Sequence, residues 1–418
     1  MNTPPADSEA SREFAAAVVA KLRAAGHETY WAGGCVRDEL LGRNPADYDV
    51  ATAAPPDAVR DVFGRRRTLA IGAAFGVITV LGPKGSGQVE VATFRADAEY
   101  TDGRHPAGVT FCSAREDAKR RDFTINGLFL DPLTGEVHDF VGGRADLAAG
   151  VVRAIGVPAQ RFGEDHLRML RAIRFTAFFD FVLDGETRAA IERMAHLVVT
   201  VSPERIAAEL RAMVERTGRE RALLLLAETG LAGEVLPELA PARGPVGEGW
   251  RSKAAVVGAL DEPVLPLALA VLASDLDAAT AARIAGRLRL SNHDSRAIAW
   301  LHAATSEIGQ ANDLHRRPWS VIQPWVADPR APLLADLLRA RAAYGLGDAA
   351  AAAWFTAQLA RPRAEIDPLP LLTGADLLAA GVPAGRSIGE ALAKARQLQL
   401  DGAVTTGEQA LAAVMPAR

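Results

Sequence analysis

The sequence has little cysteine, no long apolar run and no excess of charge of either sign. Only two of its 418 residues are cysteines, Cys35 and Cys112, too few for a disulfide framework or a structural zinc site. The longest apolar run that we find, VLPLALAVLA at residues 264–273, contains a proline and is too short to span a bilayer. The first residues, MNTPPADSEASREF, hold no apolar segment, so we expect no signal peptide. We therefore expect a reduced, cytoplasmic protein that does not associate with a membrane.

The composition is that of a globular chain, with 49% hydrophobic residues, 23% charged residues and a formal net charge of −4. Affinity for a polyanion must then come from a local basic patch, because the overall field is weak. A chain of 418 residues is too long for one ordinary hydrophobic core, so several domains are expected. Nothing in the sequence indicates an obligate protein partner.

The chain changes character after about 150 residues. The first part alternates helix-like and β-branched segments, with hairpin patterns at residues 74–94 and 127–140. The rest is rich in alanine, leucine and arginine with helical periodicity, and proline and glycine clusters mark joints within it. These patterns predict an α+β head domain with a mixed or antiparallel sheet, followed by an all-α neck, body and tail. We place the four parts at residues 1–150, 151–215, 216–320 and 321–418.

Two aspartates separated by one residue stand in the strand-like segment DYDVAT. Side chains alternate along a strand, so Asp47 and Asp49 share one face and Tyr48 takes the other. Two such carboxylates repel each other unless a divalent cation lies between them, and Mg²⁺ prefers carboxylates together with substrate phosphates. A solvated turn is the alternative. Glu90, between two valines in QVEVATFR, is either a third carboxylate of this group or a solvent-facing strand position.

A glycine pair precedes these aspartates in TYWAGGCVRD. Gly33 and Gly34 lie between a predicted strand and a short helix, where the backbone can approach a phosphate group. Arg37, in the first turn of that helix, is placed to contact a phosphate oxygen. A tight turn without a ligand is the alternative. Together with the aspartate pair, the glycines favour an in-line phosphoryl displacement on divalent metal ions.

A second basic segment, AKRRDFTING, precedes an apolar strand. Arg121 is a candidate to neutralise a triphosphate, Asp122 to accept from a ribose hydroxyl, and Asn126 to contact the nucleotide. A solvated helix end is the alternative. The polar stretch EYTDGRHPAGVTF, at residues 99–111, is predicted to be a long loop, and such loops are often functional.

The segment QRFGEDHLRMLRAIRF, at residues 160–175, is predicted to form one helix. At about 100° per residue, Asp165, Arg168 and Arg171 fall within an arc of roughly 120°. An arginine donates to a ring nitrogen, and a carboxylate accepts from an exocyclic amino group. The pair Asp165–Arg168 therefore fits cytosine and adenine and rejects uracil and guanine. A salt-bridged surface helix is the alternative.

Four of these segments occur together in one order: GGCVRD, LLGRNPADYDVAT, RRDFTING and EDHLRMLRAIRF. In them the chain resembles the class II tRNA nucleotidyltransferases, which are the bacterial CCA-adding enzymes, and the related bacterial poly(A) polymerases. The helical half resembles the family more loosely, at residues 202–214 and 372–402. The resemblance implies a polymerase-β-like nucleotidyltransferase head. It also implies Mg²⁺-dependent addition of CCA to the tRNA 3′ end from CTP and ATP, without a nucleic-acid template and with release of pyrophosphate.

The resemblance assigns roles at the metal and phosphate end of the site. It makes Asp47 and Asp49 ligands of the catalytic Mg²⁺, with Glu90 as a third carboxylate. It makes Gly34 and Arg37 the residues that hold the phosphates of the incoming nucleotide.

At the other end of the site, Arg121 matches a nucleotide-binding position and Asp122 a ribose-sensing position. Gly127 stands where many relatives carry alanine or serine, a departure that we expect to be harmless. The residues that match the protein template for the base and its support are Asp165, Arg168, Arg171 and Arg174.

Other functions stay open on the sequence alone. A bacterial poly(A) polymerase would share the head chemistry, although AIGAAFGVITV and the stretch at residues 99–111 look more like the CCA-adding branch. An enzyme that adds only A, partnered by a separate CC-adding protein, fits the same residues. A catalytically silent RNA-binding scaffold would have no use for two carboxylates on one face of a strand.

Overall fold

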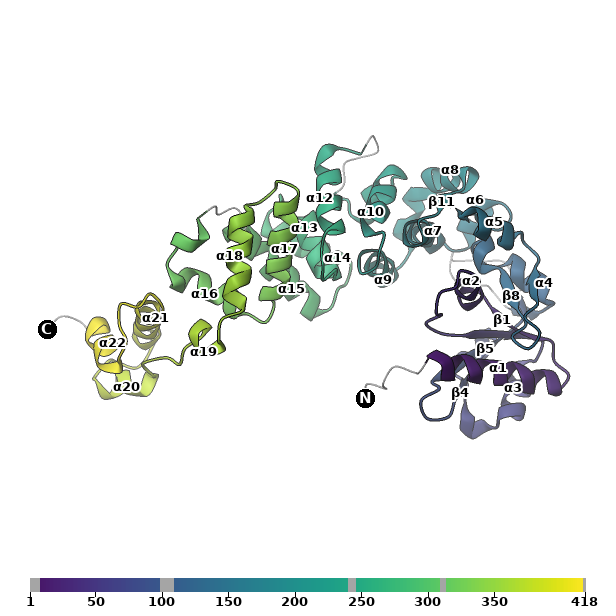
Figure 1. The fold of residues 1–418 in the computed structure, drawn as a ribbon, viewed down its shortest axis with the longest axis horizontal. Coiled ribbons are helices and arrows are strands. Elements are labelled where there is room, and N and C mark those ends of the chain that lie inside the picture. Colours follow the sequence, from purple (N-terminus) through teal and green to yellow (C-terminus); the bar gives the residue numbers. More distant parts are fainter. Residues whose placement is uncertain (1–7, 98–108, 240–245, 309–312, 416–418) are drawn as a thin grey trace. The chain divides into compact units, whose positions relative to one another are not determined.

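The structure is a computed structural model that describes residues 8–97, 109–239, 246–308 and 313–415. The chain divides into two compact units, whose elements are labelled in Figure 1. Unit 1 comprises residues 1–213 and 221–245, and unit 2 comprises residues 214–220 and 246–418. The finer division into head, neck, body and tail remains a prediction. No helix within the described ranges is long and apolar enough to cross a membrane.

Unit 1 contains a mixed sheet that has seven strands in the described residues. The strands are β1 (Thr29–Ala32), β2 (Asp49–Thr52), β3 (Thr68–Leu69), β4 (Val77–Leu81), β5 (Gln88–Thr93), β8 (Leu128–Leu130) and β9 (Val137–Asp139). Their order is β3-β4-β5-β2-β1-β8-β9, in which β2 and β5 are parallel and the other neighbours antiparallel. The sheet confirms the predicted α+β head, and both predicted hairpins are present as β4–β5 and β8–β9.

Two further strands, which follow β5 in the sequence, form a separate antiparallel sheet. It consists of β6 (Arg95–Asp97) and β7 (Val109–Phe111). Most of the loop predicted at residues 99–111 lies outside the described residues.

Helices cover both faces of the sheet in the head. On one face α1 (Ser8–Ala24) packs beside α3 (Pro56–Phe63), and Val18 and Leu22 of α1 are fully buried. On the other face α4 (Ala114–Lys119) shares a core with Ala51 and Phe129 through its small residues. Because side chains alternate along β2, Asp49 projects on the same side as Ala51, toward α4. The helix α2 (Gly34–Leu40) follows β1 directly and packs against β1 and β8.

After the head sheet, the regular elements of the described residues are helices apart from one short parallel pair of strands. That pair is formed by β10 (Val151–Val152) and β11 (Val182–Leu183). The helices up to residue 235 are α5 (Gly143–Ala149), α6 (Pro158–Glu164), α7 (Leu167–Phe179), α8 (Gly185–Met194), α9 (Pro203–Val214), α10 (Arg219–Glu228) and α11 (Leu231–Val235).

The single helix predicted at residues 160–175 is wrong, because the chain forms two helices there. Asp165 lies between α6 and α7 with an extended backbone, φ −151° and ψ 106°. Its Oδ1 accepts a hydrogen bond from the Leu167 N–H at 3.1 Å. Aspartate favours bonds of this kind, which compete with the helical hydrogen bonds of the backbone. Asp165 therefore lies ahead of the first turn of α7, and only Arg168 and Arg171 of the predicted trio stand on that helix.

Unit 2 is built from helices in its described residues. Those after residue 246 are α12 (Glu248–Gly258), α13 (Leu265–Leu272), α14 (Ala278–Arg287), α15 (Asn292–Glu307), α16 (Trp319–Ala327), α17 (Ala331–Ala343), α18 (Ala349–Leu359), α19 (Arg363–Ile366), α20 (Gly374–Ala379), α21 (Arg386–Leu400) and α22 (Gly407–Val414). The last three surround a small core that includes Leu377, Ala395 and Ala410. The helical remainder predicted from the sequence is thus confirmed.

Gly127 is closely packed between two neighbouring side chains. A Cβ atom on Gly127 would lie 2.6 Å from Val141 Cγ2 and 3.2 Å from Ile155 Cδ1. The valine methyl thus fills the space that a larger residue at position 127 would need. Val141 and Gly127 are thus matched in size, and the expectation that glycine is harmless here stays a prediction.

We expect Gly127→Ala to lower the free energy of unfolding of unit 1 by about 1–3 kcal/mol, because the added methyl overpacks the site. The double variant Gly127→Ala/Val141→Ala should be more stable than Gly127→Ala alone, since the second change removes the clash. Amide hydrogen exchange of the buried strands β1 and β2 measures both effects. Strictly additive effects of the two changes would contradict the packing argument.

Candidate active site

A cleft of about 610 Å³ in unit 1 gathers the side chains that the sequence singled out. Glu90 is the one predicted site residue that does not line it. The predicted residues in the lining are Gly33, Gly34, Arg37, Asp47, Asp49, Arg121, Asp122, Asn126, Asp165, Arg168, Arg171 and Arg174. Arg120, Leu167, Phe175 and Arg205 complete it.

The two aspartates face the cleft from the start of β2. Both carboxylates are exposed, whereas Tyr48 between them is buried. The Tyr48 ring packs 4.6 Å from the Trp31 ring centroid, and its hydroxyl donates to Glu39 Oε1 at 2.7 Å. Asp47 precedes the first strand residue, Asp49, so the observed strand is shorter than the predicted one. The predicted alternation nevertheless holds, because the buried tyrosine fixes the opposite direction for its two neighbours.

Glu90 stands next to Asp49 on the neighbouring strand. The two residues are register partners in the parallel pair of β2 and β5, so their side chains project to the same side. Desolvation of the carboxylate by the surrounding protein, followed by the charges of Asp47 and Glu90, raises the pKa of Asp49 to about 6. Glu90 thus belongs to the same electrostatic group, and its role as a metal ligand remains a prediction.

The acidic group at β2 fits a divalent cation only with help from another ligand. Within the described residues, no three His, Cys, Asp or Glu side chains are close enough to hold a metal ion by themselves. Two exposed carboxylates that repel each other suit a cation whose remaining ligands are phosphate oxygens and water. The residues present therefore fit a metal that binds together with a phosphorylated substrate.

The glycine turn and Arg121 occupy the same corner of the cleft. Gly33 has a φ of +79°, and a Cβ on it would lie 2.8 Å from Arg121 Nη1. The same guanidinium donates to the Asn126 carbonyl at 3.4 Å and lies over the Phe129 ring, 5.0 Å from its centroid. The backbone angle favours glycine at position 33, and the absence of a side chain lets the arginine approach the turn closely.

Arg37 is more enclosed than its predicted role as a phosphate contact implies. Only 7% of it is exposed, and it lies over the rings of Phe175 and Phe179, 5.2 Å and 4.5 Å from their centroids. It pairs with Asp38 at 2.8 Å and donates to Asn126 Oδ1 at 2.7 Å. Burial lowers the pKa of the Arg37 guanidinium even though Asp38 opposes the shift. The side chain therefore links α2 to α7 while still bordering the cleft.

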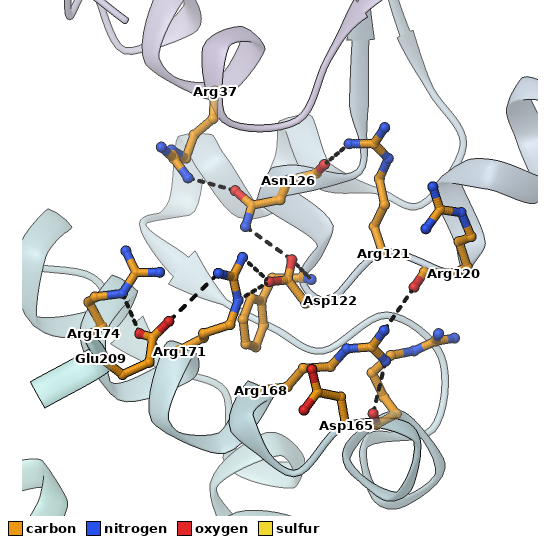
Figure 2. A network of polar contacts seen from close by, with 12 residues as sticks. Arg37, Arg120, Arg121, Asp122, Asn126, Asp165, Arg168, Arg171, Arg174 and Glu209 are labelled. Carbon is orange, nitrogen blue, oxygen red and sulfur yellow. Dashed lines mark hydrogen bonds and ion pairs between the residues drawn. The ribbon is translucent and has the colours of Figure 1, made fainter. Parts of the chain in front are cut away.

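A chain of polar contacts runs from Arg37 to the helix α7, as Figure 2 shows. Asn126 accepts from Arg37 and donates from its Nδ2 to Asp122 Oδ1 at 3.1 Å. Asp122 Oδ2 pairs with the Arg171 guanidinium, with distances of 2.7 Å to Nη2 and 2.8 Å to Nε. Burial alone would raise the pKa of Asp122, but Arg171 and Asn126 bring it down to about 2. Asp122 is therefore ionised, and its oxygens already have partners within the protein.

A buried carboxylate on α9 extends this chain. Glu209 is 8% exposed and accepts from Arg174 Nε at 2.7 Å, while Arg171 Nη1 lies 3.8 Å from its other oxygen. Arg174 also lies over the Phe175 ring, 4.3 Å from its centroid. Glu209 thus separates and holds two arginines that would otherwise repel each other on one helix.

Asp165 and Arg168 border the cleft together, but neither is the partner of the other. Asp165 Oδ2 pairs with Arg205 of α9 at 2.7 Å. Arg168 pairs with Glu164, and it donates to the backbone carbonyls of Arg161 and Arg120 at 2.9 Å and 3.3 Å. Each is therefore held by other groups, so both can present polar atoms to a ligand in fixed directions.

The residues that the sequence did not identify are mostly the partners of those that it did. Arg205 and Glu209, both on α9, were not among the site residues predicted from the sequence. Their spacing of four residues on α9 reads as a surface ion pair. Only the fold shows that each of them instead pairs with another segment of the chain.

The chain is similar to known proteins in sequence and in fold. Residues 29–153 match the family model of the poly A polymerase head domain, and residues 180–243 match a probable RNA and SrmB-binding site of polymerase A. The CCA-adding enzyme of Anoxybacillus flavithermus is 42% identical over 227 residues, which are 54% of this chain and 56% of that protein. That of Enterococcus faecalis is 43% identical over 216 residues, 51% of this chain and 52% of that protein. The chain thus aligns with a little over half the length of these relatives.

Solved structures resemble the chain over nearly its whole length. The Bacillus stearothermophilus CCA-adding enzyme in complex with CTP has a TM-score of 0.77 and 28% identity, with 97% of each chain covered. The Thermotoga maritima CCA-adding enzyme complexed with tRNA has a TM-score of 0.68 and 21% identity, covering 96% of this chain and 94% of that one. At that identity the second likeness concerns the fold alone.

The ion pair of Asp122 and Arg171 has a defined pH signature. Because the pKa of Asp122 is below its ordinary value when folded, the carboxylate stabilises the folded state fully above about pH 4, and this contribution is lost as the pH falls toward 2. We expect Asp122→Asn to lower the free energy of unfolding of unit 1 by about 2–3 kcal/mol at pH 7, and by about half as much at pH 3.

Amide hydrogen exchange in β1 and β2 of the full chain gives this difference at both pH values. Asp180→Asn is the matched control, because Asp180 pairs with Arg221 in the same unit but its side chain is 89% exposed. It should change the free energy by no more than about 1 kcal/mol. An effect of Asp122→Asn that stays constant from pH 7 to pH 3 would show that the charge of Asp122 is not its cause.

Proposed function

Because the head and neck of this chain belong to the family of tRNA nucleotidyltransferases and bacterial poly(A) polymerases, we propose that the protein adds CCA to the 3′ end of tRNA. It uses CTP and ATP, depends on Mg²⁺ and releases pyrophosphate. One observation carries the proposal: a single cleft holds two carboxylates on one face of a strand, a glycine turn covered by an arginine, and the Asp165–Arg168 pair. CCA-adding enzymes are 42% and 43% identical to the chain over about half of its length, and a solved CCA-adding enzyme resembles 97% of it.

The proposed reaction is an in-line displacement at the α-phosphate of the nucleotide. The tRNA 3′ hydroxyl attacks, a new P–O bond forms, and the bond to the β-phosphate breaks to release pyrophosphate. Asp47 and Asp49 would hold Mg²⁺, which supplies activation of the attacking hydroxyl and charge neutralisation at the phosphates. Arg121 and the Gly33–Gly34 turn would face the triphosphate. Catalysis then rests on positioning and on donors that are already in place.

Asp165 and Arg168 are proposed to read the base. Cytosine offers an acceptor at N3 and an amino group at N4, and adenine offers the same pair at N1 and N6. Uracil and guanine present a carbonyl and a ring N–H instead, so both contacts fail. Each buried polar group left without a partner costs about 1–3 kcal/mol. Arg205 holds Asp165, and Glu164 holds Arg168. Neither side chain can therefore readily reorient to form hydrogen bonds with uracil or guanine.

Two further roles are proposed, one for the recognition of the ribose and one for the binding of tRNA. Asp122 is proposed to sense the ribose, with Arg171, Arg174 and Asn126 fixing its surroundings. The helical tail at residues 321–418 is proposed to bind tRNA, mainly through shape and backbone contacts. Mg²⁺ as the metal and the tRNA 3′ end as the acceptor are part of the proposal.

Poly(A) polymerase is the second candidate, because the model that matches residues 29–153 is that of a poly A polymerase head domain. Both enzymes use the same chemistry and differ in the acceptor and in the number of nucleotides added. An enzyme that adds only the terminal A is distinguished because it would not add CMP when it is given CTP.

The deciding experiment uses purified full-length protein, Mg²⁺ and tRNA that lacks its last three nucleotides. With CTP alone we expect two CMP additions, and with CTP and ATP together we expect one further AMP and then termination. Electrophoresis of end-labelled tRNA resolves each step. Long A-tails would indicate a poly(A) polymerase, and activity with ATP only on tRNA ending in CC would indicate an A-adding enzyme.

Arg168→Ala should relax the choice of base, because the donor that rejects uracil and guanine is removed. We expect the ratio of kcat/KM for CTP to that for UTP to fall by about tenfold or more, as one lost contact of about 1–3 kcal/mol implies. Arg188→Ala is the control, since Arg188 lies on α8 outside the cleft and pairs with Glu192. If selectivity survives in Arg168→Ala, the base-reading assignment is wrong.

A further inference from the structure

Asp117 is a buried carboxylate behind the arginines of the cleft. It lies on α4, is 1% exposed, and does not itself line the cleft. Its neighbours Arg120 and Arg121, three and four residues further on, both do. A charged group that is almost inaccessible to water requires partners that compensate it.

The two oxygens of Asp117 are divided between the two arginines. Oδ1 accepts from Arg120, at 2.9 Å from Nε and 2.8 Å from Nη2. Oδ2 accepts from Arg121, at 3.2 Å from Nε and 3.1 Å from Nη2. Each guanidinium is thus held through two nitrogens, which fixes its plane as well as its position. The backbone N–H of Arg95 adds a further bond to Oδ1 at 3.3 Å.

Asp117 carries a full charge under ordinary conditions. Burial alone would raise the pKa of Asp117, but the guanidinium groups of Arg121 and Arg120 hold it below the ordinary value. The ion pairs therefore persist at neutral pH. They are not surface pairs, because the side chains of the two arginines are only 22% and 19% exposed.

Contacts with Gly33, Asn126 and Phe129 also define the position of the Arg121 guanidinium. Its Nη1 lies 2.8 Å from the position that a Cβ on Gly33 would take, and it donates to the Asn126 carbonyl. The Phe129 ring lies beneath its guanidinium. Asp117 thus holds the arginine through Nε and Nη2, whereas its Nη1 lies next to the glycine turn that is proposed to face the triphosphate.

We propose that Asp117 is a positioning residue that fixes the directions in which Arg120 and Arg121 meet the triphosphate, an inference that rests on the function proposed above. Asp117 does not touch the nucleotide. It acts by holding two donors in the orientation that the departing pyrophosphate needs.

The charge and the orientation provided by Asp117 have opposite effects on a bound triphosphate. The negative charge of Asp117 weakens the attraction of the cleft for anions, whereas the fixed guanidinium planes help only in the right geometry. Removal of the charge should therefore leave the binding of a polyphosphate nearly unchanged or slightly tighter. The chemical step should slow, because misdirected donors stabilise the transition state less well.

Asp117→Asn in the full-length protein tests this separation, because it keeps the shape of the side chain and removes its charge. We expect kcat for CMP addition to fall by about tenfold or more, the usual effect of disturbing a preorganised donor. The Kd of inorganic tripolyphosphate, measured by calorimetry, should stay within about threefold of that of the unaltered protein. Asp117→Glu, which keeps the charge but moves it by one methylene, should give an intermediate kcat.

Asp131→Asn is the matched control. Asp131 is also buried in the head, at 4% exposure, and pairs with Arg23 at 2.6 Å away from the cleft. It should lose stability but keep kcat within about twofold. Circular dichroism reports whether each variant is folded. If Asp117→Asn does not fold, the kcat of Asp117→Glu decides whether Asp117 is a positioning residue.

Two results would overturn the inference. One is an unchanged kcat in the folded Asp117 variants, and the other is a tenfold loss of tripolyphosphate binding with kcat retained. Failure of the proposed function looks different, because the unaltered protein itself would then add no CMP to tRNA.

Discussion

Pairing between arginine and carboxylate groups is the interaction on which the cleft depends. Many guanidinium groups face one small space, and their mutual repulsion would open it if each lacked a carboxylate. The arginines are Arg37, Arg120, Arg121, Arg168, Arg171, Arg174 and Arg205, and the carboxylates that hold them are Asp38, Asp117, Asp122, Glu164, Glu209 and Asp165. The cleft is thus rich in donors while staying close to neutral. This explains how a chain with a net charge of −4 can offer a site for a triphosphate.

The same pairs connect the sheet to the helices that follow it. Asp122, ahead of β8, holds Arg171 of α7, and α7 in turn is held by Glu209 of α9. Aromatic rings support the guanidinium planes, with Phe175 next to both Arg37 and Arg174. Such donors cost little reorganisation when a charged ligand arrives, which is the condition for electrostatic catalysis. Lysine would not serve, because a flexible ammonium group cannot be held in a plane by two bonds.

The carboxylates at the acidic end of the cleft, unlike its arginines, are not balanced by paired charges of the protein. Asp47, Asp49 and Glu90 form no ion pair with another described residue. Desolvation, followed by the charges of Asp47 and Glu90, raises the pKa of Asp49 although the charge of Arg121 opposes the shift. A group of carboxylates that is poorly compensated by the protein is suited to a cation that arrives with the substrate. The protein thus balances its arginines internally and leaves its aspartates for an external charge.

The sequence by itself determined the α+β head, the two hairpins, the helical remainder and most of the residues that line the cleft. Those predictions rest on local periodicity, on glycine turns and on the alternation of side chains along a strand, and each of these acts over a few residues. The break at Asp165 escaped prediction because one side-chain bond to the Leu167 N–H outweighs helical periodicity. The tertiary structure alone decided the partners of three of the cleft arginines, since Arg171 and Asp122 are 49 residues apart, Arg205 and Asp165 are 40, and Arg174 and Glu209 are 35. Charges so far apart in sequence carry no local signal, and only the packing of sheet and helices selects which of them meet.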